Sequence, residues 1–269
     1  MPELPEVETT RRGIEPWLDG QSIRALDIRN GALRWPVSGE LYGLQDQRVV
    51  QVLRRGKYIL LELETGTIII HLGMSGSLRV VEASAEIKKH DHVDIVVSNG
   101  KRLRFNDPRR FGCLLWTQDW TQHALIRSLG PEPLSDEFEA DYFYHALQKR
   151  SSPIKLAIMD SHLVVGVGNI YANEALFISG IDPRRAANRI SKARVATLRD
   201  AIVEVLGAAI RQGGTTLRDF VNSDGKPGYF SQQLRVYGKA GAPCQVCATE
   251  LKEVRQSQRS TVFCPRCQK

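Results

Sequence analysis

Two cysteine pairs near the end of the chain, Cys244-Gln-Val-Cys247 and Cys264-Pro-Arg-Cys267, most strongly determine a local fold. Tetrahedral zinc binds four soft ligands, and each C-x2-C turn presents two thiolates from one loop. Two such turns, separated here by sixteen residues, complete the coordination shell and leave no position open for chemistry. The alternative is a pair of disulfides, which the rest of the chain disfavours. The sequence therefore predicts one structural Zn2+ in a small ribbon.

The whole chain has the composition of a globular protein with a basic surface. It has 269 residues, of which 42% are hydrophobic and 25% charged, so we expect more than one domain. The net charge of +7 and the isoelectric point near 9.3 favour a polyanionic partner. Residues 228–269 alone carry seven Lys or Arg against two Glu. This basic ribbon indicates a nucleic-acid contact, although a solvated surface would have the same composition.

No stretch of the sequence has the properties of a targeting or membrane segment. The start, MPELPEVETTRRG, is polar and lacks the apolar centre of a signal peptide. No apolar run approaches the length of a membrane span. The fifth cysteine, Cys113, lies in the apolar run Gly-Cys-Leu-Leu-Trp and is most simply a small buried side chain. We therefore expect a cytoplasmic protein that does not bind membranes.

The first half of the chain predicts one helix followed by many short strands. Leu4, Val7 and Ile14 recur at helical spacing over 4–15, and Pro16 is expected to stop or kink that helix. The β-rich runs that follow are punctuated by glycines and by Asn99-Gly100, a strong hairpin signal. Many short strands at this spacing predict an antiparallel sandwich. The expected strands are 23–29, 49–54, 58–63, 67–72, 77–81, 92–97, 102–105 and 113–116.

The second half predicts helices. Gly130-Pro-Glu-Pro-Leu-Ser reads as a linker, and helical patterns follow at 135–149, 153–160, 170–179 and 191–211. Residues 215–230, with Ser-Asp-Gly-Lys-Pro-Gly, predict a mobile loop. The fold class is therefore α+β: an N-terminal helix and antiparallel sandwich, a helical domain, and a zinc ribbon. The expected domains are 1–130, 135–230 and 235–269.

The start of the chain also contains a candidate nucleophile, the amine of Pro2. Removal of Met1 would leave Pro2 with a free secondary amine, which is far less basic than a lysine side chain. Attack of this amine on a sugar C1′ would give a positively charged iminium, an electron sink for elimination. Glu3 lies next to it and could exchange protons with the same sugar. Pro2 alone is more simply explained as the ordinary start of a helix.

Five ordered motifs decide between these interpretations. They are MPELPEVE at the start, HLGMSG at 71–76, DPRRFG at 107–112, VGVGNIY at 165–171 and the terminal cysteine pairs. Together they resemble the bacterial formamidopyrimidine-DNA glycosylases, which remove oxidised purines such as 8-oxoguanine and cleave the abasic site by β,δ-elimination. The resemblance covers nearly the whole chain. It implies a helix–two-turn–helix in the helical domain and places Asn169 at the start of a helix whose N–H groups suit phosphate.

The resemblance implies a role for each matched residue. Pro2 would be the Schiff-base nucleophile, and Glu3 would protonate the opening deoxyribose. Lys57 would act as an acid or base, although such a lysine between two strands is usually a solvated charge. Arg259 would serve the second elimination, and its high pKa makes a grip on phosphate its expected contribution. These four residues, Pro2, Glu3, Lys57 and Arg259, are the predicted catalytic set.

The remaining matched residues imply contacts to DNA. Met74, Arg109 and Phe111 match the family's intercalating residues, which fill the gap left by an extruded nucleotide. Met74 and Phe111 could instead be core, but their neighbouring glycines favour exposed loops. Lys155 is followed by Leu-Ala-Ile where many members have proline, a departure at the start of its helix. The residues expected to grip the DNA backbone are His90, Arg110, Arg150, Lys155 and Asn169.

Two other interpretations compete with this one. Endonuclease VIII has the same architecture and prefers oxidised pyrimidines, but it typically has glycine where this chain has Leu4, and it lacks the Met/Arg/Phe triad. A non-catalytic zinc-ribbon protein would bind DNA without needing Pro2, Glu3 and Lys57. We therefore expect a monomeric repair enzyme whose partner is damaged double-stranded DNA at the bacterial nucleoid.

Overall fold

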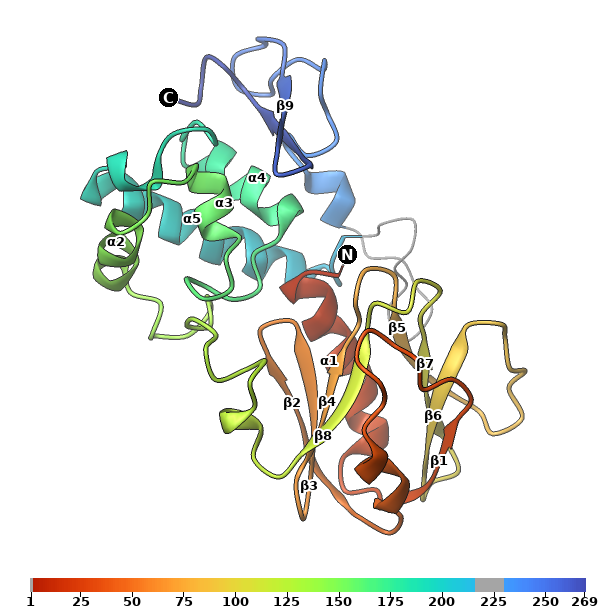
Figure 1. Cartoon of the computed structure of the whole chain (residues 1–269). Helices are drawn as coiled ribbons and strands as arrows, with labels where there is room; N and C mark the ends of the chain where they lie inside the picture. Colours follow the sequence, from red (N-terminus) through yellow and green to blue (C-terminus); the bar gives the residue numbers. More distant parts are fainter. Residues whose placement is uncertain (1, 216–229) are drawn as a thin grey trace. The chain divides into compact units, whose positions relative to one another are not determined.

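A computed structural model of the chain describes residues 2–215 and 230–269. The described residues divide into a first unit, 2–128 with 212–215, and a second unit, 129–211 with 230–269 (Figure 1). The second unit thus contains both the helices and the ribbon expected at 235–269. The mobile loop expected at 215–230 lies outside the described residues, apart from its two end residues.

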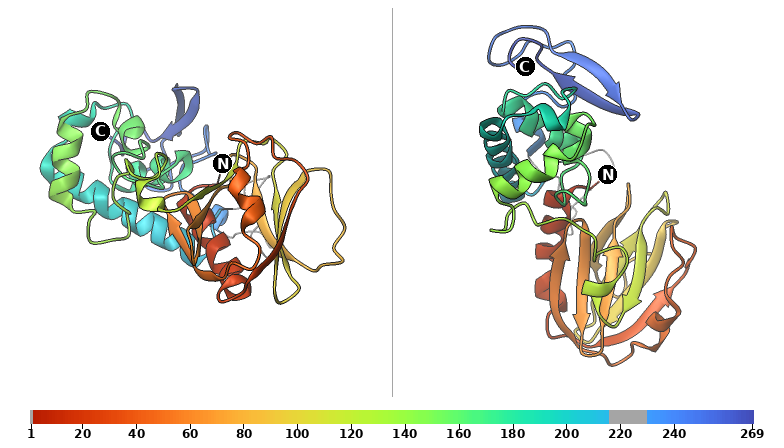
Figure 2. Two further views of the ribbon diagram at one scale, coloured as in Figure 1. Left: turned by 60° about the horizontal axis from the view of Figure 1, so that its bottom comes forward. Right: turned by 60° about the vertical axis from the view of Figure 1, so that its left-hand side comes forward.

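The first unit is the predicted antiparallel sandwich, and each predicted strand is present. One sheet has the order β1-β6-β7-β5, and the other has the order β2-β3-β4-β8. All pairings within them are antiparallel, and Figure 2 shows the two sheets from further sides. The first sheet contains β1 (Ile23–Ile28), β6 (Asp91–Val97), β7 (Arg102–Asn106) and β5 (Ser77–Val81). The second contains β2 (Val49–Arg55), β3 (Tyr58–Leu63), β4 (Thr67–His71) and β8 (Cys113–Thr117).

The core lies between the two sheets because side chains alternate along each strand. Ile59 and Leu61 of β3 belong to the same buried cluster as Leu103 and Phe105 of β7. Short 3-10 turns at Gly39–Gly43 and Trp120–Gln122 complete the unit. One face of each sheet therefore lies in a shared core.

The helix α1 (Leu4–Leu18) carries the start of the chain along the sandwich and contacts β2, β3 and β5. Ile14 and Leu18 join the core between the sheets. Pro16 does not stop the helix as expected, because α1 continues to Leu18. Proline removes one N–H donor, and only two residues of α1 follow it, so little helix remains to be disturbed.

The second unit is helical, with bounds close to those predicted. It contains α2 (Ala140–Gln148), α3 (Ile154–Ile158), α4 (Asn169–Ile178) and α5 (Lys192–Arg211), with 3-10 turns at Ala187–Arg189 and Phe230–Gln233. The first helix begins at Ala140 and not at 135, because 135–138 form turns: the amide of Ser135 donates to Glu132 and that of Phe138 to Ser135. The turns between α3 and α4 give the expected helix–two-turn–helix.

The expected linker at 130–135 is a packed segment. The Gly130 amide donates to the Ser161 carbonyl at 2.8 Å, and a Cβ on Gly130 would lie 2.7 Å from the Leu163 backbone. The glycine and prolines that predicted a linker therefore allow the close approach of two backbones. This contact lies within the second unit.

The ribbon is a hairpin of β9 (Lys252–Gln256) and β10 (Arg259–Phe263) beside the cysteine turns. Val262 and Leu251 pack with Cys244 and Cys264, and Phe177 of α4 belongs to the same cluster. The ribbon therefore packs on α4, which explains why the ribbon and the helices belong to one unit.

Candidate catalytic residues and nucleic-acid interface

Pro2 and Glu3 lie at the start of α1, and both are buried. Glu3 has extended backbone and occupies the N-cap position. Glu6, three residues later, returns its Oε2 to the Glu3 amide at 2.8 Å, the reciprocal contact of a capping box. The first turn of α1 therefore fixes the position of the predicted nucleophile and its neighbouring acid.

Glu6 was not among the predicted site residues. It is fully buried, and its Oε1 accepts the Thr215 amide at 2.8 Å. Gly214 comes so close that a Cβ would lie 3.0 Å from Oε1, and its φ of +81° also favours glycine. The sequence did contain a signal for Glu6, a Glu three residues after the N-cap, but this pattern indicates only the start of a helix.

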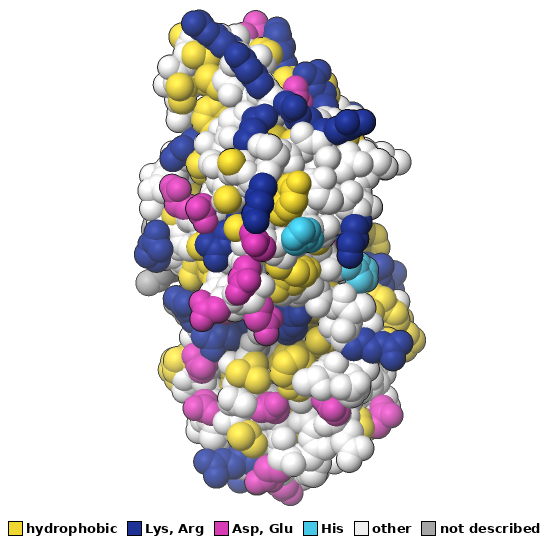
Figure 3. Space-filling view, turned by 90° about the vertical axis from the view of Figure 1, so that its left-hand side faces the viewer, with side chains coloured by type: hydrophobic (Ala, Val, Ile, Leu, Met, Phe, Trp, Pro, Cys, Tyr) yellow, Lys and Arg dark blue, Asp and Glu magenta, His cyan; other side chains and the backbone are white. Residues whose placement is uncertain are grey.

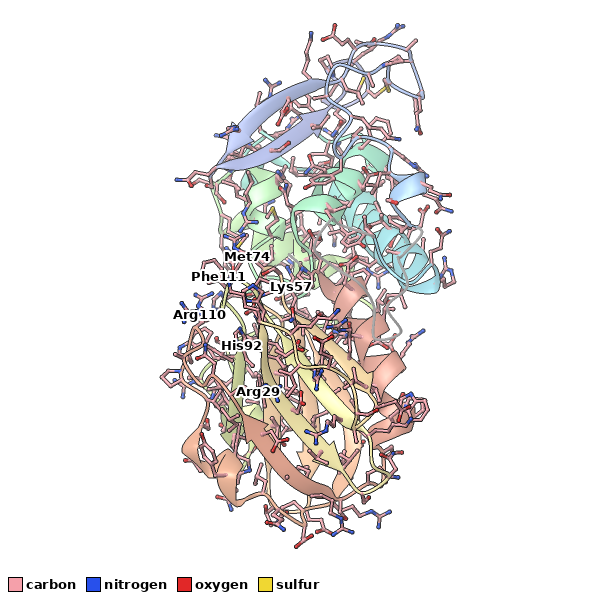
Figure 4. All side chains as sticks on the ribbon, turned by 90° about the vertical axis from the view of Figure 1, so that its right-hand side faces the viewer. Arg29, Lys57, Met74, His92, Arg110 and Phe111 are labelled. Carbon is pink, nitrogen blue, oxygen red and sulfur yellow. The ribbon has the colours of Figure 1, made fainter. Side chains whose placement is uncertain are left out.

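Lys57 occupies the second position of the two-residue turn between β2 and β3. Gly56 provides the positive φ, +56°, at the first position of this turn. The Lys57 side chain is half-buried, and it is near enough to His71 for its charge to contribute to the lowered pKa of that imidazole. The turn thus holds a cation at the same end of the sandwich as Met74 and Phe111 (Figure 4).

His71, at the end of β4, was also missed. Its Nδ1 accepts the Gly73 amide at 3.0 Å, and its ring packs on Tyr58 with centroids 4.9 Å apart. Burial, and then the charges of Lys57 and Arg34, lower the pKa of His71 to about 4. A neutral imidazole with an accepting Nδ1 is therefore built into the start of the Met74 loop.

The three predicted intercalating residues lie in two loops at one end of the sandwich. Met74 and Phe111 are 39% and 41% exposed, as the glycines beside them predicted. The Arg109 guanidinium lies 4.8 Å from the centre of the Phe111 ring, so these two side chains stack. The Met74 thioether and the Phe111 ring lie at the same end of the sandwich (Figure 4), and the Arg109 guanidinium stacks on that ring.

Arg110 lies in the same loop as Arg109 and Phe111, and His90 lies just before β6. The half-buried ring of His90 lies 6.4 Å from that of His92 in an edge arrangement. Arg110 is exposed and has a φ of +56°, which is unusual for a residue with a side chain. Strain of this kind concentrates at functional sites, where the surroundings impose it.

Arg150 and Asn169 belong to the second unit. The Arg150 Nη1 lies 2.5 Å from Asp160 Oδ2, so it is already in an ion pair. Although burial opposes it, hydrogen bonds from His162 and Arg150 hold the pKa of Asp160 below its usual value. Asn169 opens α4, and its buried Oδ1 has no hydrogen-bond partner among the described residues.

Lys155 differs from expectation. It is 0% exposed, and its Nζ donates to the Ser260 carbonyl at 2.8 Å and to Thr261 Oγ1 at 2.7 Å. A buried ammonium bonded in this way does not present its charge to phosphate. It joins α3 to the strand that begins at Arg259, so its place in the structure is a support for the ribbon.

Arg259 is exposed at the tip of the ribbon. It pairs with Gln256 across a two-residue turn in which Ser257 and Gln258 have φ of +45° and +63°. Two positive φ values are the pattern of a type I′ turn, which normally takes Asn-Gly. The turn that presents Arg259 is therefore strained.

The four ribbon cysteines are arranged for zinc. Their sulfur atoms all lie within 4.8 Å of one another, and all five cysteines of the chain are free of disulfides. The Cys244–Cys267 and Cys247–Cys264 sulfur distances are 3.9 and 3.5 Å. Tetrahedral coordination at a Zn–S distance of about 2.3 Å requires about 3.8 Å between sulfurs. The donor set therefore fits one Zn2+ with no position left for a substrate.

The ribbon also carries a group of exposed cations, as its composition predicted. Figure 3 shows Lys and Arg side chains gathered at the end of the second unit that carries the ribbon. Such a group attracts the phosphates of nucleic acid. The exposed Lys and Arg residues within 235–269 are Arg235, Lys252, Arg255, Arg259, Arg266 and Lys269.

Three family descriptions match successive parts of the chain. Residues 1–114 match the formamidopyrimidine-DNA glycosylase N-terminal domain, and 129–221 match the H2TH domain of the same proteins. Residues 241–269 match the zinc finger found in FPG and IleRS. The chain belongs to the formamidopyrimidine-DNA glycosylase family.

Full-length relatives agree with this membership. The formamidopyrimidine-DNA glycosylase of Marinobacter nauticus is 60% identical over 270 residues, and that of Escherichia coli O7:K1 is 56% identical over 269, with both chains covered completely. The crystal structure of the Thermus thermophilus MutM (FPG) protein has a TM-score of 0.90 at 38% identity, over 99% of this chain and 98% of that one. The Lactococcus lactis Fpg in complex with DNA containing an abasic site has a TM-score of 0.91 at 32% identity, over 99% of each chain.

Membership of this family and the sulfur geometry together establish the ribbon as a structural zinc finger. The α+β architecture expected from the sequence is confirmed by the same likeness. Among residues 2–215 and 230–269, no helix combines the length and apolar character needed to cross a bilayer.

Proposed function

We propose that Pro2 is the nucleophile with which this base-excision repair enzyme removes oxidised purines, such as 8-oxoguanine and formamidopyrimidines, from duplex DNA. Loss of Met1 would leave an amine with a pKa of about 8, against about 10.4 for lysine, so more of it is unprotonated at neutral pH. The observation that carries the proposal is the capped first turn of α1. Glu6 holds the Glu3 amide and thereby fixes the Pro2–Glu3 backbone.

The chemistry proceeds through a covalent sugar intermediate. The Pro2 nitrogen attacks C1′, the glycosidic bond breaks, and the damaged base leaves with its electron pair. Glu3 protonates the ring oxygen as the deoxyribose opens to the iminium. Lys57, acting as a base, then takes the C2′ proton while the C3′–O bond breaks and releases the 3′ phosphate. Loss of the C4′ proton while the C5′–O bond breaks then releases the 5′ phosphate. Arg259 orders the leaving phosphate, because a guanidinium holds its proton too firmly to donate it.

Met74, Arg109 and Phe111 support extrusion of the damaged nucleotide. Flipping a base costs a few kcal/mol of stacking and pairing, which inserted side chains offset. The exposed thioether and ring fill the gap, and the stacked guanidinium faces the orphaned base. His90, Arg110, Arg150 and Asn169 grip the DNA backbone.

We further propose that one chain acts alone, at the bacterial nucleoid, because it carries the nucleophile and the phosphate-binding residues itself. The endonuclease VIII-like alternative, directed at oxidised pyrimidines, is not favoured. Leu4 follows Glu3 in place of the glycine typical of that relative, and the Met74, Arg109 and Phe111 triad is present.

Borohydride trapping tests the nucleophile. With an 8-oxoguanine duplex, the reduced adduct should map to Pro2 by peptide mass spectrometry, and Pro2→Gly should trap far less. Pro5→Gly is the matched control, because it replaces a proline in the same helical turn that has no free amine. Its adduct should still map to Pro2. An adduct on Lys57 would contradict the assignment.

A further inference from the structure

The two loops that carry the predicted wedge lie side by side because of the strand order. Residues 72–76 connect β4 to β5, and residues 107–112 connect β7 to β8, so each passes from one sheet to the other. His71 pairs with Cys113 where both loops meet one sheet, and Ser77 pairs with Asn106 where they meet the other. Neither loop can therefore shift without affecting its neighbour.

Asp107 joins the two loops through its carboxylate. Its Oδ1 accepts the Ser75 hydroxyl and the Arg109 amide, each at 3.2 Å. Its Oδ2 accepts the Gly112 amide at 2.8 Å. One carboxylate thus holds the residue after Met74 and both residues that flank the Arg110–Phe111 pair.

The backbone of Asp107 adds a third segment. Its amide donates to the His90 carbonyl at 3.1 Å, and its carbonyl accepts the Arg110 amide at 3.2 Å. The same carbonyl lies 2.8 Å from His92 Nε2, which therefore carries the proton. The strand that presents His90 is tied to the same residue.

The backbones of the two loops are packed too closely to rearrange independently. A Cβ on Gly73 would lie 2.5 Å from the Gly112 nitrogen and from the Phe111 carbonyl carbon. A Cβ on Gly112 would lie 2.5 Å from the His71 carbonyl and 3.2 Å from Asp107 Oδ2. The backbones are therefore interlocked around the carboxylate.

We propose that Asp107 is the positioning residue that makes Met74, Arg109 and Phe111 act as one preformed wedge. Asp107 is 0% exposed and so does not touch DNA, whereas Met74 and Phe111 are more than a third exposed. The inference rests on the proposed function, in which these side chains fill the space of an extruded nucleotide. Preorganisation matters here because a wedge that must first be ordered offsets less of the cost of extrusion.

Asp107→Asn is the sharpest variant because it keeps the shape of the side chain. An amide group replaces one accepting oxygen, so at least one backbone N–H among Arg109 and Gly112 faces a donor instead of an acceptor. Asp94→Asn is the matched control. Asp94 is equally buried in the same unit but binds Arg29 and Arg104, and Arg29 lies further along the sandwich (Figure 4).

The experiment uses the zinc-loaded full chain and separates extrusion from the later chemistry. We expect Asp107→Asn to lower 2-aminopurine-reported extrusion and single-turnover base release by about tenfold, as for a lost buried hydrogen bond. Cleavage of a preformed abasic site, which has no base to extrude, should stay within about twofold. Asp94→Asn should lower the melting temperature and leave base release of the folded enzyme unchanged. Unchanged base release in Asp107→Asn, or an equal loss of both activities, would overturn the proposal.

A double-mutant cycle distinguishes bridging from general stability. Ser75→Ala removes only the contact between the loops, so its effect on extrusion should be smaller in the Asp107→Asn background than alone. Additive effects would count against a bridge. If Asp107→Asn does not fold, Ser75→Ala carries the test, and its extrusion rate must fall without a change in the salt dependence of binding. Met74→Ala and Phe111→Ala separate the two hypotheses: if neither impairs extrusion, the wedge itself is wrong.

Discussion

At the scale of a single residue, His71 shows how a buried imidazole can couple pH to a loop. Its folded pKa of about 4 lies below the usual 6.5, because of burial and the nearby charges of Lys57 and Arg34. As pH falls, the unfolded chain takes up the proton first, so stability is complete above about pH 6.5 and declines toward pH 4. Protonation of His71 also removes the Nδ1 acceptor of the Gly73 amide.

His71→Asn should remove this part of the pH dependence, because an amide oxygen can accept from Gly73 but does not titrate. Between pH 7.5 and pH 5 the wild type should lose up to about 2 kcal/mol more free energy of unfolding than the variant. Urea titrations at both pH values measure the difference, and the other titrating groups are common to both proteins. Equal pH dependence in the two proteins would show that His71 is not held neutral.

At the scale of elements, the sequence predicted each strand of the sandwich and each α-helix, but not the two ribbon strands β9 and β10 and not how the strands are ordered. The β-rich runs, the glycines between them and Asn99-Gly100 locate strand ends to within about a residue, because these signals are local. The order β1-β6-β7-β5 joins strands that are distant in sequence, and no local pattern records it. Helix α2 begins later than predicted because turns made by Ser135 and Phe138 compete with the helical pattern.

The same division holds for the site. Met74 and Phe111 could be placed in exposed loops from adjacent glycines, and the cysteine pairs from their spacing. Glu6, Ser75 and Asp107 act through buried polar contacts, and the contacts of Glu6 with Thr215 and of Ser75 with Asp107 exist only once distant segments meet. Lys155 was predicted to meet phosphate because it matches a residue of the family that grips the DNA backbone, and its burial could not be read from the sequence.

The ribbon hairpin provides a prediction at the same scale. Ser257 and Gln258 occupy two positive-φ positions, where non-glycine residues carry strain. Replacing the pair by Asn-Gly should slow amide exchange across β9 and β10 by about three- to tenfold. Gln258→Val should speed it, because a β-branched residue disfavours this conformation. Hydrogen exchange measured by mass spectrometry compares them, and a shift in the same direction for both variants would contradict a strained turn.

At the scale of the whole molecule, the proposed function divides the DNA contacts into two kinds. In that proposal the sandwich supplies the nucleophile, Lys57, the wedge and the phosphate contacts of His90 and Arg110, and the helical unit supplies further phosphate contacts, including the exposed cations of the zinc ribbon. Wedge residues determine which nucleotide is extruded, whereas cations determine affinity for any duplex. The salt dependence of binding therefore reports the second kind of contact and not the first.

One arginine variant and one lysine variant, each of which removes a single positive charge, test which cations reach phosphate. Arg110 is exposed, so Arg110→Gln should reduce the slope of log Kd against log salt by about 0.9, the value for one B-DNA phosphate. Lys155 is buried against Ser260 and Thr261, so Lys155→Met should leave the slope unchanged. Fluorescence anisotropy with an undamaged duplex above about 0.1 M salt, where long-range effects are screened, provides the measurement. If both variants flatten the slope equally, the Lys155 ammonium leaves its pocket to bind DNA, and its support of the Arg259 strand is not its main task.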